Sequence, residues 1–91
     1  MINLKELIES GALLIDVRTP DEYSAGHVAA SRNIPLDRIS DQVDVIKAQS
    51  KPVITICRSG ARSGVAAEML RNAGIEVYNG GGWSEFEKLI K

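Results

Sequence analysis

The stretch 53-VITICRSGARSGVAAEM-69 joins an unbroken apolar run to a short polar loop and a second, differently patterned apolar run. Residues 53–56 favour extended structure, and a continuous apolar run is typical of a strand buried on both faces. After the loop, small and apolar residues recur at helical spacing from about residue 62 to residue 73, and Gly74 predicts the end of that helix. The predicted inner face of the helix consists of Val65, Ala66, Met69, Leu70 and Ala73.

Helices and strands alternate on both sides of this stretch. Helices are predicted over residues 4–10 and 20–25, from residue 39, and from residue 84, with the N-caps Asn3, Thr19, Ser40 and Ser84. Further strands are predicted over residues 12–17, 31–35 and 75–79, and the glycines at 80–82 predict a turn that approaches the loop after Cys57. This alternation predicts an α/β fold with a central, mostly parallel sheet of four to five short strands and helices on both faces.

Cys57 ends the central predicted strand, and in such folds ligands bind beyond the carboxyl ends of strands. The unpaired N–H groups of the loop and of the helix start can form an anion-binding nest, and Gly60 tolerates the positive φ that this bend needs. Arg58 and Arg62 add positive charge. Lowering a thiol pKa of about 8.5 by about two units takes about 2.7 kcal/mol. A helix N-terminus supplies about 0.3–2 kcal/mol, and a nearby arginine supplies up to about 4 kcal/mol before desolvation.

This loop therefore predicts an ionised, nucleophilic Cys57. The alternative interpretation is a purely structural thiol, because a lone cysteine after an apolar run is often a small buried hydrophobe.

Size and composition narrow the class of protein. The 91 residues predict one domain over residues 1–91, and a net charge of −1 argues against nonspecific nucleic-acid binding. The single cysteine allows no internal disulfide and suits a reducing compartment. Neither a signal peptide nor a membrane span is recognisable, so we expect a cytoplasmic protein without membrane association. One cysteine and one histidine do not make a metal site, and we expect neither metal nor cofactor.

Three ordered motifs resemble the rhodanese family, the thiosulfate or persulfide sulfurtransferases, in its single-domain form. They are LLIDVRTPDEYSAGHVAASRNIP (13–35), CRSGARS (57–63) and GIEVYNGGGWSEF (74–86), so the resemblance covers nearly the whole chain. The chain departs from the family where residues 28–30 read Val-Ala-Ala instead of the frequent Ile-Pro-Gly. We expect this departure to change a turn and not the chemistry.

The resemblance implies a rhodanese-like domain and a two-step sulfur transfer. Cys57 is expected to take the outer sulfur of thiosulfate or of a persulfide donor, forming a persulfide, and to pass it to cyanide or a thiol acceptor. The expected substrate-binding loop consists of Arg58, Ser59, Gly60, Ala61, Arg62 and Ser63. The resemblance also admits a protein persulfide donor or a thioredoxin-like acceptor. The oligomeric state expected is a monomer or a weak dimer.

Three other functions compete with this reading. A non-catalytic interaction module, or a relay that carries persulfide only from a protein donor, would keep Cys57 but react poorly with thiosulfate. A cysteine phosphatase has five residues between its cysteine and arginine, whereas four separate Cys57 from Arg62. A tighter loop suits one sulfur atom better than a tetrahedral oxyanion. A Cys-His protease is disfavoured because His27 is the only histidine and no orienting third residue is evident.

Other polar and aromatic residues are expected to be structural. Asp16 and Arg18 flank a strand end and predict an ion pair with a neighbour such as Glu22, with at most a minor role in shaping the site. His27 is expected to be a structural hydrogen-bonding group, and Trp83 is expected in the core.

Overall fold

The structure is a computed structural model that describes residues 2–91. Its sheet, in the described residues, consists of β1 (Leu13–Asp16), β2 (Arg32–Asn33), β3 (Val53–Cys57) and β4 (Val77–Gly82). The surrounding helical elements are α1 (Leu4–Glu9), α2 (Pro20–Ser24), the 3-10 turn η1 (Leu36–Arg38), α3 (Ile39–Ala48), α4 (Ala61–Asn72) and α5 (Trp83–Ile90). The strand order is β2-β1-β3-β4, and each neighbouring pair is parallel. The prediction of an α/β fold is confirmed, with four strands.

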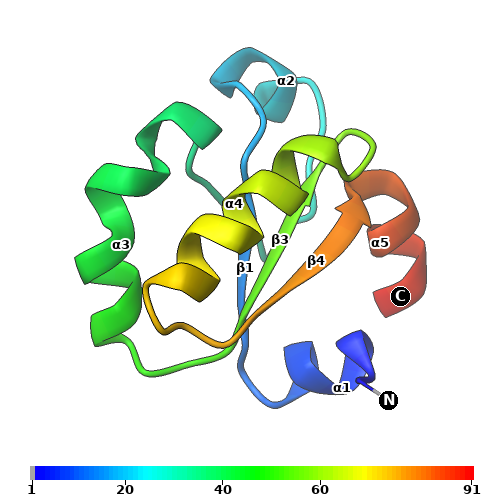
Figure 1. Cartoon of the computed structure of the whole chain (residues 1–91). Helices are drawn as coiled ribbons and strands as arrows, with labels where there is room; N and C mark the ends of the chain where they lie inside the picture. Colours follow the sequence, from blue (N-terminus) through cyan, green and yellow to red (C-terminus); the bar gives the residue numbers. More distant parts are fainter. Residues whose placement is uncertain (1) are drawn as a thin grey trace.

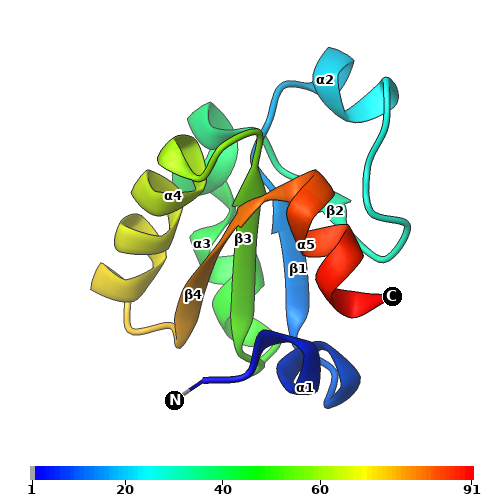
Figure 2. The ribbon, with the colours of Figure 1, turned by 90° about the vertical axis from the view of Figure 1, so that its right-hand side faces the viewer.

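Helices cover both faces of the sheet, as the sequence predicts. Figure 2 shows α3 and α4 on one side of β1, β3 and β4, and α1 and α5 on the other. All residues of β3 are buried, and their side chains alternate between the two layers. Val53 and Cys57 belong to the core under α3 and α4, whereas Ile54 and Ile56 belong to the core that includes Phe86 of α5. Burial on both faces explains why β3 reads as a continuous apolar run.

Two of the four predicted helix caps are present. The side chain of Asn3 accepts a hydrogen bond from the Glu6 backbone N–H, and Thr19 and Glu22 form a reciprocal capping box. The predictions for Ser40 and Ser84 are wrong, because α3 begins one residue before Ser40 and α5 one residue before Ser84. The turn η1 leads straight into α3, and β4 leads straight into α5, so each serine lies inside the first turn of its helix.

Strand β4 continues through the glycines that were expected to form a turn. Thr55 pairs with Asn79 and Ile56 pairs with Gly81, so Gly80 is an extra residue in the strand, a β-bulge. A Cβ atom on Gly80 would lie 2.8 Å from Cγ2 of Ile54 and 2.9 Å from Cγ2 of Ile56. Only glycine lets β4 pass this close to β3, which is why a run that reads as a turn forms a strand. Its predicted approach to the loop after Cys57 is confirmed, since Gly82 pairs with Cys57.

The prediction that Val65 faces the core is wrong. Its side chain is 53% exposed, and the buried face of α4 is formed by Ser63, Ala66, Ala67 and Leu70. The helix is therefore rotated so that a hydroxyl, and not a branched apolar side chain, faces the end of β3. This rotation brings Ser63 to the cysteine.

The carboxyl ends of the parallel strands lie at one end of the molecule. Figure 1 shows the loop between β3 and α4 at this end, with α2 beside it. Segments distant in sequence, around residues 16–22, 57–63 and 79–82, therefore meet where this class of fold binds ligands.

Candidate active site

Cys57 lies at the last position of β3 and is 1% exposed. Its sulfur is nevertheless surrounded by hydrogen-bond donors. The backbone N–H of Gly60 donates to Sγ at 3.0 Å, and the hydroxyl of Ser63 lies 3.3 Å from Sγ. A buried thiol packed only by hydrocarbon has no such partners, so the purely structural interpretation of Cys57 does not account for this arrangement.

Gly60 creates the turn that aims the loop at the sulfur. It is the N-cap of α4 and has φ +104°, in the left-handed region that glycine adopts readily. This conformation directs its N–H toward Sγ, while its carbonyl accepts the hydrogen bond of the Gly64 N–H in the first turn of α4. The sulfur thus lies at the N-terminus of a helix, where negative charge is stabilised.

The environment of Cys57 lowers the pKa of its thiol. Burial, the largest single influence, raises this pKa, but the hydroxyl of Ser63 and the backbone N–H groups of Ser63, Gly60 and Ser59 donate hydrogen bonds and together lower it. The sequence-based expectation of a lowered pKa is met in direction. The cause of the shift differs from the expectation. Hydrogen bonds from the loop lower this pKa, whereas the sequence analysis assigned the largest contribution to the charge of an arginine.

Asn79 ties the loop to β4, and sequence reasoning missed it. Its Oδ1 accepts from the Ser63 hydroxyl at 2.7 Å and from the Gly81 N–H at 3.0 Å, and its Nδ2 donates to the Gly60 carbonyl at 3.0 Å. The Ser63 hydroxyl carries one hydrogen, so it donates either to Asn79 or to Cys57. The bulge at Gly80 sets the local course of β4, and the only signal in the sequence was an asparagine before three glycines.

The two arginines of the loop have different surroundings. Arg58 is exposed, and no acidic side chain of the described residues pairs with it. Arg62 is paired with Glu22, with Nη1 to Oε1 at 2.6 Å and Nη2 to Oε2 at 2.9 Å. The hydrogen bonds that Arg62 donates to Glu22 raise the pKa of Arg62, although desolvation opposes this shift, and the negative charges of Glu22, Cys57 and Asp16 raise it further. The structure therefore brings both arginines to the loop but leaves only one of them unpaired.

Asp16 and Arg18 form an ion pair with each other, and neither forms the predicted ion pair with the side chain of Glu22. Both are buried, with Arg18 Nη2 at 2.7 Å from Asp16 Oδ2, and Arg18 Nη1 donates to the backbone carbonyl of Glu22 at 3.2 Å. The guanidinium carbon of Arg18 lies 4.7 Å from the ring centroid of Trp83, a cation–π contact. This cluster fastens the segment carrying α2 to the sheet and so holds Glu22 near the loop.

His27 is structural, as expected from the sequence. Its Nδ1 lies 2.8 Å from the Tyr23 carbonyl, and its ring stacks on that of Tyr23 with centroids 3.8 Å apart. Within the described residues, the imidazole of His27 forms no hydrogen bond with Cys57. This geometry gives a Cys-His pair no support.

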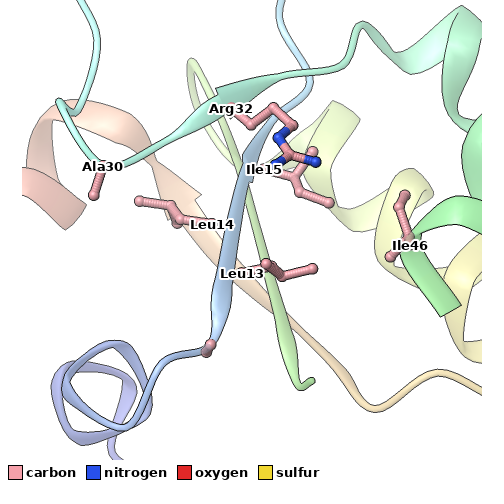
Figure 3. Close-up of a pocket in the computed structure, with 7 residues that line it drawn as sticks. Leu13, Leu14, Ile15, Ala30, Arg32 and Ile46 are labelled. Carbon is pink, nitrogen blue, oxygen red and sulfur yellow. The ribbon is translucent and has the colours of Figure 1, made fainter. Parts of the chain in front are cut away.

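Two hollows differ in their relation to the loop. Figure 3 shows the residues that line a cavity: residues 12–15 of the β1 region, Ala30 and Arg32 near β2, and Ile46 of α3. The volume of this cavity is about 110 Å³. No loop residue lines it. An open groove of about 480 Å³ instead reaches Arg62 and is lined further by Val17, Thr19, Pro35, Leu36 and Asp37. The groove, and not the cavity, adjoins the loop after Cys57.

The described residues, 2–91, offer neither a metal cluster nor a membrane-spanning helix. Among these residues, no cluster of three or more histidine, cysteine, aspartate or glutamate side chains could hold a metal ion. None of the helices formed by them has the length and apolar character needed to span a bilayer.

Comparison with known proteins relates this geometry to a family. The sequence profile of the Rhodanese-like domain matches residues 2–89. The uncharacterised protein YqhL of Bacillus subtilis is 43% identical over 82 residues, which cover 88% of this chain and 64% of the relative. Thiosulfate sulfurtransferase PspE of Escherichia coli is 36% identical over 70 residues, covering 75% of this chain and 67% of the relative.

A solved structure described as a rhodanese with anions from E. coli superposes with a TM-score of 0.74 at 32% identity. The superposition covers 82% of this chain and 91% of the E. coli chain. The chain spans less than two thirds of the Bacillus relative. The profile match over nearly all of its residues, together with the agreement in fold, shows that the chain belongs to the rhodanese-like domain family.

Proposed function

We propose that the protein is a sulfurtransferase in which Cys57 carries the transferred sulfur as a persulfide. The observation that carries this proposal is the pair of donors at the sulfur, the Gly60 N–H at 3.0 Å and the Ser63 hydroxyl at 3.3 Å. They stabilise negative charge on a buried thiol at a helix N-terminus. The thiosulfate sulfurtransferases among its relatives support the same reaction class.

In the first step, the Cys57 thiolate attacks the outer sulfur of thiosulfate. A sulfur–sulfur bond forms to Sγ, the bond between the two sulfurs of thiosulfate breaks, and sulfite leaves with the electron pair. The negative charge moves to the outer sulfur of the new persulfide. The free N–H groups of the loop and of the first turn of α4 are the donors available to this charge.

In the second step, a nucleophilic acceptor removes the outer sulfur. Cyanide attacks it, the bond to Sγ breaks, thiocyanate leaves, and the Cys57 thiolate is regenerated. A thiol acceptor reacts in the same way as its thiolate and leaves as a persulfide. The proposed site therefore consists of Cys57 as nucleophile and the backbone and side chains of residues 58–63 as the binding loop.

The test is mass spectrometry of the intact protein after mixing with thiosulfate. We expect a gain of one sulfur atom on Cys57 and loss of that atom when cyanide is added, with release of thiocyanate. Persulfide that forms only from a protein donor would instead identify a relay module. Hydrolysis of p-nitrophenyl phosphate without any persulfide would identify a phosphatase and would contradict the proposal.

A further inference from the structure

The ion pair between Arg62 and Glu22 sets the charge at the rim of the proposed site. Both oxygens of the carboxylate bind the guanidinium, at 2.6 and 2.9 Å, in the two-point geometry that makes such pairs strong. Arg62 lies in the first turn of α4, and its charge interacts with that of Cys57. A guanidinium that could attract an anionic donor is therefore already occupied by an internal anion.

Glu22 is held in this position by its own helix. The backbone N–H of Thr19 donates to its Oε1 at 3.0 Å, and the Thr19 hydroxyl lies 3.1 Å from the same oxygen. This capping box fixes the carboxylate at the start of α2, independently of Arg62. The buried pair of Asp16 and Arg18 in turn holds the segment. Glu22 is thus a built part of the rim and not a mobile surface charge.

The charges of Arg62 and Glu22 at the rim cancel. Arg62 is positive, and Glu22 and the thiolate of Cys57 are negative. The Glu22 carboxylate cancels the charge of Arg62, whereas without this carboxylate a donor with two negative charges would meet an uncompensated guanidinium. The Coulomb energy between a charge at the rim and a donor is proportional to the charge of the donor. A change of charge at the rim therefore alters the binding of a doubly charged donor more than that of a singly charged one.

We propose that Glu22 is a specificity-determining residue that disfavours doubly charged sulfur donors relative to singly charged ones. This inference rests on the proposed sulfur transfer at Cys57. It assigns to Glu22 a role beyond capping α2.

The experiment compares thiosulfate with methanethiosulfonate, which has one negative charge and transfers its outer sulfur with methanesulfinate as leaving group. The variant is Glu22→Gln, because glutamine also serves in a capping box and removes the charge with little change in shape. The ratio of kcat/KM for the two donors cancels effects on the nucleophile, since Cys57 attacks both. The matched control is Glu68→Gln, which removes the same charge from an exposed ion pair with Arg71 further along α4.

We expect Glu22→Gln to lower KM for thiosulfate about two- to fivefold, the range typical of partly exposed charge pairs, and to change KM for methanethiosulfonate less. The shift should diminish at about 1 M salt, where screening acts within about 3 Å. Glu68→Gln should leave the donor ratio unchanged. A second variant, Arg62→Gln, leaves Glu22 uncompensated and should move the ratio in the opposite direction.

Two outcomes would overturn the inference, and they are distinguishable. If the wild-type protein forms a persulfide from both donors but Glu22→Gln and Arg62→Gln leave their ratio unchanged, Glu22 does not set specificity, and the proposed function stands. If neither donor places sulfur on Cys57 of the wild-type protein, the proposed function fails, and this inference fails with it.

Discussion

Arg62 and Glu22, 40 residues apart in the sequence, form a two-point ion pair that joins α4 to α2 across the carboxyl end of the sheet. The hydrogen bond from Arg62, followed by that from the Thr19 backbone, lowers the pKa of Glu22 from 4.5 to about 2, although desolvation opposes the shift. The same ion pair therefore contributes to the stability of the fold and sets the charge beside the proposed site.

The lowered pKa of Glu22 predicts a specific pH dependence of stability. Below pH 4.5 the unfolded chain binds a proton at Glu22 that the folded chain does not, so the contribution of the pair is complete above pH 4.5 and is lost as the pH falls toward about 2. We expect the free energy of unfolding, measured with urea, to fall more steeply over this pH range for the wild type than for Glu22→Gln. Parallel curves for the two proteins would contradict the ion pair.

Replacing the nucleophile should separate chemistry from folding. In Cys57→Ser, the smaller hydroxyl keeps the Gly60 N–H as a donor, so we expect a folded protein with little change in thermal unfolding. Sulfur transfer should fall to background, because the hydroxyl forms no persulfide. Intact-protein mass spectrometry and thiocyanate release check this result, and retained activity would reject Cys57 as the sulfur carrier.

The hydroxyl of Ser63 should control the reactivity of the cysteine. In Ser63→Ala one of the donors that lower the pKa of Cys57 is lost while its burial remains, so this pKa should rise. Alkylation by iodoacetamide should be slower near neutral pH and approach the wild-type rate only at higher pH, where the thiol of the variant also ionises. Ser59→Ala is the matched control, because Ser59 acts through its backbone N–H; equal effects of both variants would contradict the role of the hydroxyl.

Stability should also change with pH through Cys57. Because its pKa is lowered in the folded state, the unfolded chain binds more protons between that value and about 8.5. The free energy of unfolding should therefore rise with pH across this window and keep the gain above it. Cys57→Ser lacks the titration and should show a flatter profile; a wild-type profile equally flat would argue against a lowered pKa.

Gly82 should be intolerant of a side chain because β4 passes close to the loop. A Cβ atom there would lie 2.8 Å from the Arg58 carbonyl oxygen. Gly82→Ala should therefore displace the loop and reduce sulfur transfer about tenfold or more, as small misplacements at active sites do. Gly11→Ala is the contrast, since its φ of +100° costs stability, but nothing lies within 4 Å of the added carbon. It should lower the unfolding temperature and leave activity unchanged.

Asn79 should stabilise both the loop and the fold. Asn79→Ala removes three hydrogen bonds, to the Gly60 carbonyl, the Ser63 hydroxyl and the Gly81 N–H, and should cost about 1–3 kcal/mol of unfolding free energy. Activity should fall as well, because the loop loses its attachment to β4. Tyr78→Phe, which removes an exposed hydrogen bond from the neighbouring residue, should do neither. An Asn79→Ala protein as stable and active as Tyr78→Phe would show that the tether is dispensable.

The amino-acid sequence is enough to predict the α/β class, the buried strand β3, the caps Asn3 and Thr19, and the position of Cys57 at a strand end before a helix. These features depend on local patterns: apolar runs, capping spacing and the freedom of Gly60 to take a positive φ. Four features emerge only when the chain is folded. Gly80–Gly82 extend a strand, Val65 faces solvent while Ser63 faces the sulfur, Asn79 holds the loop, and Glu22 neutralises Arg62. Each of these depends on which distant segments the parallel sheet brings to one edge, and no local pattern in the chain encodes that proximity.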